Sequence, residues 1–135
     1  EMEKYAVKVG GGENHRMTLS EMVLIKENHI TVAGSIKEAI KRVKGRGLLV
    51  EIEVKNMEEL KEALDEGVDM VLLDNWDAES TREAVNFIGG RLPVEASGDM
   101  TIERAQRVAR EGVDYISVGA LTHSFKSMNL SLLLI

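Results

Sequence analysis

The sequence contains no cysteine, which excludes disulfide bonds, cysteine-based zinc sites and thiol catalysis and fits a reducing compartment. It also lacks an apolar stretch of the roughly 20 residues that a membrane-spanning helix needs. Its first residues, 1–4, are mostly charged and do not follow the basic-then-apolar order of a signal peptide. We therefore expect a soluble, cytoplasmic protein that does not bind membranes.

Positive charge is scarce as well. The chain has 17 Lys and Arg against 23 Asp and Glu, a net charge of −6, and an isoelectric point of about 5.1. This balance argues against broad electrostatic attraction to nucleic acid or anionic lipid. Any anionic ligand must then be bound by a local cluster of donors.

The length and apolar content fit one domain. With 135 residues, 44% of them hydrophobic, the chain can bury one core. Its first residue is Glu1 rather than methionine, and the segment that follows has helical character. From this we expect the chain to begin inside a longer protein.

From about residue 20 onward, apolar segments of strand length alternate with amphipathic segments of helix length. Helical periodicity begins after a cap such as Ser35 and stops at a glycine such as Gly67 or Gly112. Residues 27–34 read as a loop, and the apolar segment 130–135 reads as a further strand. The pattern predicts strands at 22–25, 48–54, 70–73, 92–96 and 115–118, and helices at 35–43, 57–66, 78–87 and 101–110.

Apolar strands that are each followed by a helix favour a parallel sheet covered by helices, the α/β class. Glu53, Asp74 and Glu95 are each 21 residues apart, about one strand and helix unit. Each strand ends in a polar residue of similar kind, which favours an open or incomplete TIM-like (β/α) barrel over a doubly wound sheet. In such barrels the active site lies at the carboxyl ends of the strands.

Three basic side chains stand where they could bind an anion. His15 and Arg16 follow the glycine run Gly10–Gly12, and adjacent cationic donors suit a carboxylate or phosphate. Lys26 directly follows the first strand and would face the barrel mouth. The alternatives are a helix stop with a solvated loop for the glycine run, and a surface lysine for Lys26.

Acidic side chains lie within or at the end of apolar strands. Glu53 and Asp74 occupy such positions, and strand alternation places Glu51 and Glu53 on one face. Carboxylates at a barrel mouth bind Mg²⁺, sugar hydroxyls or a developing positive charge. The alternative is an internal salt bridge from Glu53 or Asp74 to Lys26 or Arg16.

Two glycine-containing turns after late strands resemble phosphate sites. Ser97 and Gly98 precede the helix that begins near residue 101, and Gly119 follows the fifth predicted strand. A glycine lets the backbone approach an anion, and the start of a helix adds its dipole. His123 could add a donor, or it could belong to a polar turn.

Six sequence segments occur in an order that resembles the carboxyl-terminal part of quinolinate phosphoribosyltransferase, also called nicotinate-nucleotide pyrophosphorylase (carboxylating). They are GGGENHR, MVLIKENHI, EIEV, VLLDN, EASGD and DYISVGALTHS, and the resemblance covers essentially the whole chain. It implies that residues 1–135 form a carboxyl-terminal (β/α) barrel segment without the family's amino-terminal α/β sandwich. It also implies a homodimer or higher homo-oligomer, because a second subunit completes the family's active site.

The resemblance implies a reaction in NAD biosynthesis. Quinolinate and phosphoribosyl pyrophosphate react in the presence of Mg²⁺ to give nicotinate mononucleotide, pyrophosphate and CO₂. By the same resemblance, His15, Arg16 and Lys26 bind the quinolinate carboxylates. Lys26 is also counted with Glu53 and Asp74 among the catalytic residues.

The phosphoribosyl donor is assigned to the acidic and glycine-containing positions. Glu53 and Asp74 would hold the ribose hydroxyls and the associated Mg²⁺, directly or through substrate and water. The resemblance assigns phosphate to Ser97, Gly98, Gly119 and His123.

Some positions depart from the family pattern. Asp99 stands where a glycine is usual, and Asn129 and Leu133 stand where acids are usual. Because the preceding domain and its cationic strand are not in this sequence, we expect the chain alone to have low activity. Three other functions are alternatives to quinolinate phosphoribosyl transfer. They are a phosphoribosyltransferase of the molybdenum-transport type, a non-catalytic half-barrel that self-associates, and a phosphate-binding aldolase or isomerase.

Overall fold

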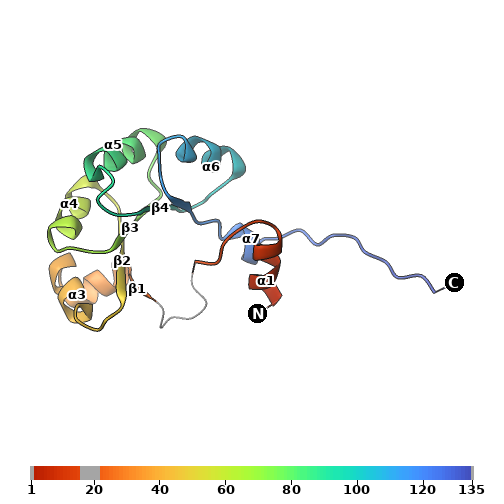
Figure 1. The fold of residues 1–135 in the computed structure, drawn as a ribbon, viewed down its shortest axis with the longest axis horizontal. Helices are drawn as coiled ribbons and strands as arrows, with labels where there is room; N and C mark the ends of the chain where they lie inside the picture. Colours follow the sequence, from red (N-terminus) through yellow and green to blue (C-terminus); the bar gives the residue numbers. More distant parts are fainter. Residues whose placement is uncertain (1, 16–21, 135) are drawn as a thin grey trace.

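The computed structural model describes residues 2–15 and 22–134 and contains one parallel five-stranded sheet (Figure 1). The strands lie side by side in chain order. This sequential order is that of a barrel wall, since a doubly wound sheet reverses its order part-way. The fold is therefore an open, TIM-like (β/α) barrel. Its strands are β1 (Met22–Ile25), β2 (Leu49–Val54), β3 (Met70–Asp74), β4 (Val94–Ser97) and β5 (Tyr115–Ile116).

Helices α3 to α6 line the outer face of this curved sheet (Figure 1). Each begins after a polar cap residue: the predicted cap Ser35, for example, accepts a hydrogen bond from the backbone N–H of Glu38. Among the described residues, no helix is long and apolar enough to cross a bilayer. The helices are α1 (Met2–Val9), α2 (Glu27–Ala33), α3 (Ile36–Val43), α4 (Met57–Asp65), α5 (Ala78–Ile88), α6 (Ile102–Ala109) and α7 (Ala120–His123).

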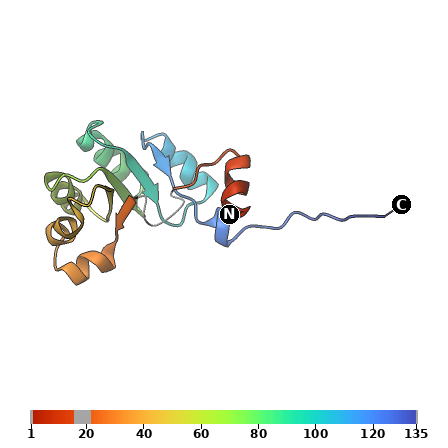
Figure 2. The same ribbon diagram turned by 60° about the horizontal axis from the view of Figure 1, so that its bottom comes forward.

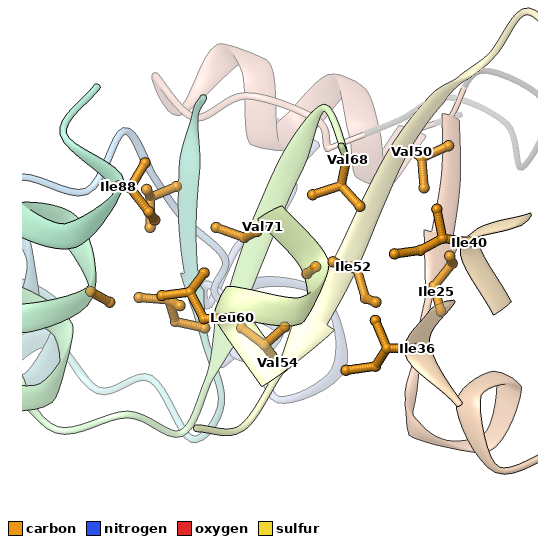
Figure 3. Packing of buried hydrophobic residues seen from close by; sticks show 14 of the residues in the cluster. Ile25, Ile36, Ile40, Val50, Ile52, Val54, Leu60, Val68, Val71 and Ile88 are labelled. Atoms are coloured by element: carbon orange, nitrogen blue, oxygen red, sulfur yellow. The ribbon is translucent and has the colours of Figure 1, made fainter. Parts of the chain in front are cut away.

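The hydrophobic core lies between the sheet and these outer helices (Figure 3). On β2, alternate residues Val50, Ile52 and Val54 point into it and are buried. They pack in the same cluster as Ile40 of α3 and Leu60 of α4, both fully buried. This alternation leaves the intervening residues of each strand, Glu51 and Glu53 on β2, on the concave face of the sheet.

Two aspartates fix the amino ends of the strands in the same way. Asp69 accepts a hydrogen bond from the backbone N–H of Val50 at 2.8 Å, and its own N–H donates to the Val50 carbonyl at 2.9 Å. Asp114 makes the same pair of contacts with Val94, at 2.8 and 2.9 Å. These reciprocal bonds tie the turn before β3 to β2 and the turn before β5 to β4, and so support the register of the sheet.

The two ends of the chain lie apart from the core. Helix α1 has no buried residue, and it lies with α7 on the side of the sheet away from α3 to α6 (Figure 1). Beyond α7 the chain runs outward in both views (Figures 1 and 2). The strand predicted at 130–135 is wrong for residues 130–134, which pair with no strand of the described chain and are exposed. Ile135 lies outside the described residues.

Other departures from the prediction concern short elements. The segment predicted as a loop at 27–34 forms α2, which ends at Gly34 in the left-handed conformation (φ 98°). Strand β5 has two residues rather than four. Short helices and strands carry few periodic positions, so the sequence pattern identifies them poorly.

Candidate active site

Lys26 and Glu53 meet at the carboxyl edge of the sheet. Ile25 of β1 is in register with Ile52 of β2, so the next residues along the two strands are Lys26 and Glu53. Lys26 Nζ lies 3.2 Å from Glu53 Oε2. The lysine side chain is 53% exposed and the glutamate 11%. The salt bridge that the sequence left open as an alternative for Glu53 is thus present, at the mouth of the barrel.

Lys26 also begins α2. Its backbone N–H donates a hydrogen bond to Nδ1 of His29 at 2.9 Å, a capping contact with the first turn of the helix. The lysine is thereby held at a fixed point between β1 and α2. His29 has a structural role here.

Asp74 and Ser97 are paired at the ends of β3 and β4. The backbone N–H of Asn75 donates to the Ser97 carbonyl at 3.0 Å, which joins the two loops. The side-chain amide of Asn75 donates to Asp74 Oδ2 at 3.2 Å. Lys26, Glu53, Asp74 and Ser97 therefore lie at the carboxyl ends of four neighbouring strands, as the barrel interpretation predicts.

Gly98 and Asn75 pack too closely for any larger residue at position 98. Gly98 has φ +88°, and a Cβ there would overlap the Asn75 side-chain amide. Asn75 itself adopts φ 60° and accepts a hydrogen bond from Arg104 Nη1 at 3.2 Å. Arg104 Nη2 donates to the Trp76 carbonyl at 3.1 Å. One arginine of α6 thus holds the loop after β3.

Gly119 and His123 lie at the two ends of α7. A Cβ on Gly119 would come within 2.8 Å of His123 Nε2, so the imidazole packs on the glycine backbone. His123 Nδ1 lies 2.7 Å from Ser124 Oγ. These two predicted phosphate residues are therefore close to each other, after the last strand of the sheet.

His15 reaches the concave face of the sheet and meets two buried glutamates. Its Nε2 lies 3.0 Å from Glu51 Oε2 and 3.3 Å from Glu95 Oε2. Ser117 Oγ donates a short hydrogen bond to Glu95 Oε1. Glu51 is 0% exposed and Glu95 2%. Arg16, the other cation of this segment, lies outside the described residues.

The buried setting changes the acidity of Glu51. Burial, with the negative charge of Glu95 in addition, raises the pKa of Glu51 to about 7, while His15 acts in the opposite direction. Its second oxygen, Oε1, is buried and has no hydrogen-bond partner in the part of the chain that the structure describes. Near neutral pH this carboxyl group can therefore exchange a proton.

Two sets of residues could hold a cation. Glu53 and Asp74, predicted as metal ligands, present carboxylates at the barrel mouth. His15, Glu51 and Glu95 each place one ligand atom within 4.8 Å of the others. The first set fits Mg²⁺, which prefers oxygen ligands and usually reaches protein sites together with substrate phosphates.

Sequence reasoning did not identify Glu51, Glu95 or Ser117 as parts of the site. Two signals were present: Glu51 alternates with Glu53, and Glu95 continues the 21-residue spacing of Glu53 and Asp74. Nothing in the local sequence indicates that Ser117 or Arg104 would contact these groups. Such contacts depend on strand pairing and on the packing of distant loops.

The sequence model of the family "Quinolinate phosphoribosyl transferase, C-terminal domain" matches residues 1–133. The chain belongs to this family. Quinolinate phosphoribosyltransferase relatives are similar over almost all of this chain but are longer. The probable nicotinate-nucleotide pyrophosphorylase [carboxylating] of Bacillus subtilis is 40% identical over 97% of this chain and 46% of its own length. The protein of the same name from Methanocaldococcus jannaschii is 43% identical over 97% of this chain and 50% of its own length. The chain thus spans about half the length of these curated relatives.

Solved structures of the family share this fold. Nicotinate-nucleotide pyrophosphorylase from Ehrlichia chaffeensis superposes with a TM-score of 0.86 and 42% identity, covering 91% of this chain and 46% of its own. Thiamine phosphate pyrophosphorylase from Pyrococcus furiosus has a TM-score of 0.57 at 22% identity, over 73% of this chain and 48% of its own. The latter likeness concerns the fold alone.

Proposed function

We propose that this chain supplies the barrel active site of a quinolinate phosphoribosyltransferase. The reaction transfers the phosphoribosyl group of phosphoribosyl pyrophosphate to the ring nitrogen of quinolinate. Pyrophosphate leaves from the sugar and the adjacent carboxylate leaves as CO₂, which gives nicotinate mononucleotide for NAD biosynthesis. The observation that carries the proposal is the convergence of Lys26, Glu53, Asp74 and Ser97 at one edge of the sheet.

Quinolinate carries two carboxylates and needs cationic donors. His15, Arg16 and Lys26 are the residues that we assign to it. Lys26 is half exposed at the barrel mouth, so its ammonium can contact a ligand while Glu53 orients it. Fixed charges of this kind position an anionic substrate without rearrangement at the moment of reaction.

Glu53 and Asp74 are assigned to the phosphoribosyl donor. When pyrophosphate leaves, positive charge develops on the ribose ring, and carboxylates placed beside it stabilise that charge. The same carboxylates would hold Mg²⁺, which when bound neutralises the charge of the leaving pyrophosphate. The Asn75 amide keeps the Asp74 carboxylate in place.

The donor phosphate is assigned to the two late loops. Ser97 and Gly98 precede α6, and Gly119 precedes α7 with His123 packed on it. Backbone N–H groups at glycines can approach a phosphate closely. Asp99, next to Gly98, adopts a positive φ of 35°.

No general base is required for the second half of the reaction. Once the pyridine nitrogen carries the ribose it is cationic, and it stabilises the electron pair that the departing CO₂ leaves on the adjacent ring carbon; that carbon then takes a proton from water. The residues of this chain then need only hold the substrate and balance its charge. We assign no residue to proton abstraction.

We further propose that the active protein is a homodimer or larger homo-oligomer. Large apolar side chains are exposed on α1 and beyond α7, including Tyr5 at 72% and Leu132 at 89%, and such surfaces favour association. The cysteine-free sequence supports a reducing compartment, such as the cytoplasm.

Titration calorimetry with quinolinate tests the substrate assignment. The folded chain should bind quinolinate saturably, and Arg16→Ala should abolish this binding. Arg82→Ala is the matched control, because Arg82 is exposed on the outer helix α5, where its Nη1 lies 4.0 Å from Glu111 Oε2. Equal binding by the wild type and the Arg16→Ala variant would contradict the assignment.

A further inference from the structure

A chain of polar side-chain contacts links three strands on the concave face. Ser117, just after β5, donates to Glu95 of β4, and Oε2 of Glu95 lies 3.3 Å from Nε2 of His15. Oε2 of Glu51 on β2 is hydrogen-bonded to the same imidazole nitrogen at 3.0 Å. The reaction proposed above gives no role to Ser117, Glu95 or Glu51.

Burying these two glutamates is costly. A buried carboxylate without full compensation destabilises a fold by several kcal/mol. In the described part of the chain, His15 is the basic side chain that contacts both, and Oε1 of Glu51 remains without a partner. An arrangement that is poor for stability points to a role in holding His15.

His15 needs such support because its backbone provides little. It lies three residues after Gly10–Gly12, outside any helix or strand. Its ring is instead tied to the rigid sheet through Nε2. The two carboxyl oxygens lie 3.0 and 3.3 Å from that nitrogen, and an ionised carboxylate at such a distance needs a hydrogen on it. Turning the ring over would place a C–H group against them.

We propose that Glu51 and Glu95 are positioning residues that fix the His15 ring, with Ser117 orienting Glu95. They hold the proton on Nε2 and turn Nδ1, which has no partner among the described residues, toward the ligand. The assignment of that ligand as quinolinate rests on the proposed function. The positions of the three side chains do not depend on the proposed function.

Charge and positioning predict opposite effects of Glu95→Gln on quinolinate binding. Removing a negative charge near an anion site should strengthen binding if charge alone matters. A positioning role predicts weaker binding, by about tenfold or more, as for other residues that orient a functional imidazole. Glu83→Gln on the exposed surface of α5 removes the same charge elsewhere and serves as the control.

The first test is nuclear magnetic resonance of the histidine rings in the ligand-free chain, with His15→Gln to assign the signal. We expect an Nε2–H proton of His15 that exchanges slowly with water. It should be weakened in Ser117→Ala and Glu95→Gln and lost in the Glu51→Gln/Glu95→Gln double variant, while His29 and His123 remain unchanged. A rapidly exchanging Nε2–H in the wild type, or an unchanged signal in the double variant, would overturn the inference.

The second test is a double-mutant cycle on quinolinate affinity. Glu95→Gln should weaken binding in the wild type and have no further effect in His15→Ala, because it acts through the ring. Stronger binding, or an equal loss in both backgrounds, would overturn the inference. If the wild type shows the protected ring proton but binds no quinolinate, the proposed function fails and the positioning of His15 stands.

Discussion

Lys26 Nζ lies 3.2 Å from Glu53 Oε2, and this contact joins a residue assigned to quinolinate with a residue assigned to the phosphoribosyl donor. The two substrates must meet for the ring nitrogen to attack the sugar. An ion pair that bridges their binding residues sets the distance between the two halves of the site. It also keeps Lys26 extended over the barrel mouth before any substrate arrives.

Replacing Lys26 with alanine should impair binding far more than folding. In the Lys26–Glu53 ion pair the lysine side chain is largely exposed, and exposed ion pairs contribute about 1 kcal/mol or less to the free energy of unfolding. We expect a change in thermal midpoint of only a few degrees and a loss of quinolinate binding of at least about tenfold, since a charged contact contributes roughly 1.5–3 kcal/mol.

Lys41→Ala provides the control for this change. Lys41 pairs with Glu38 on the outer helix α3 at 3.0 Å and is similarly exposed. It should leave both folding and binding unchanged. A Lys26→Ala variant that binds quinolinate as the wild type does would remove Lys26 from the site.

The raised pKa of Glu51 predicts a particular pH dependence of stability. Its ordinary value is 4.5, and in the folded chain burial raises its pKa to about 7. The folded state therefore holds this proton more tightly than the unfolded state does. The contribution is fully present below pH 4.5 and is lost as pH rises through about 7. The loss between pH 5 and 8 amounts to about 3 kcal/mol at most.

Denaturant unfolding of the wild type and Glu51→Gln across this pH range measures the effect. The difference in unfolding free energy between the two should move in favour of Glu51→Gln as pH rises. Glu83→Gln should follow the wild type throughout. A pH-independent difference for Glu51→Gln would show that Glu51 titrates alike in the folded and unfolded states.

Much of this architecture is predictable from the sequence because long segments repeat the same signal. The four outer helices and five strands follow from periodicity, caps and glycine stops, and the mouth positions of Lys26, Glu53 and Asp74 follow from strand ends. The apolar segment 130–134 is wrongly predicted as a strand, because a strand forms only beside a partner strand and the local apolar pattern does not show whether one is available. The contacts of His15 with Glu51 and Glu95 depend on where a glycine-rich loop crosses the sheet, and periodicity does not describe that path.

Gly98 should tolerate no side chain. Gly98→Ala meets both an unfavourable φ of +88° and the amide of Asn75, and we expect a loss of about 2–4 kcal/mol in unfolding free energy. Gly45→Ala isolates the backbone part, because Gly45 has φ +82° and no atom of the described chain lies within 4 Å of a Cβ placed there. It should lose about 1–2 kcal/mol. Equal losses in the two variants would show that Asn75 yields without cost.

Binding of phosphoribosyl pyrophosphate should depend on a divalent cation and on Asp74. We expect measurable affinity with Mg²⁺, a large loss when the cation is chelated, and a similar loss in Asp74→Asn. Asp65→Asn, near the end of α4 on the outer surface, is the control. Calorimetry in the presence and absence of Mg²⁺ measures both effects. Affinity that is insensitive to the cation would argue against Glu53 and Asp74 as its ligands.

The most direct test of the central claim is amide chemical-shift mapping of the chain during titration with quinolinate and with Mg²⁺ phosphoribosyl pyrophosphate. The account predicts that quinolinate shifts the amides around His15 and Lys26, and that the donor shifts those of Asp74, Gly98 and Gly119. All of these belong to the loops at the carboxyl edge or to the segment that crosses the concave face. Shifts at the amino edge, around Asp69 and Asp114, or none in a folded chain, would contradict it.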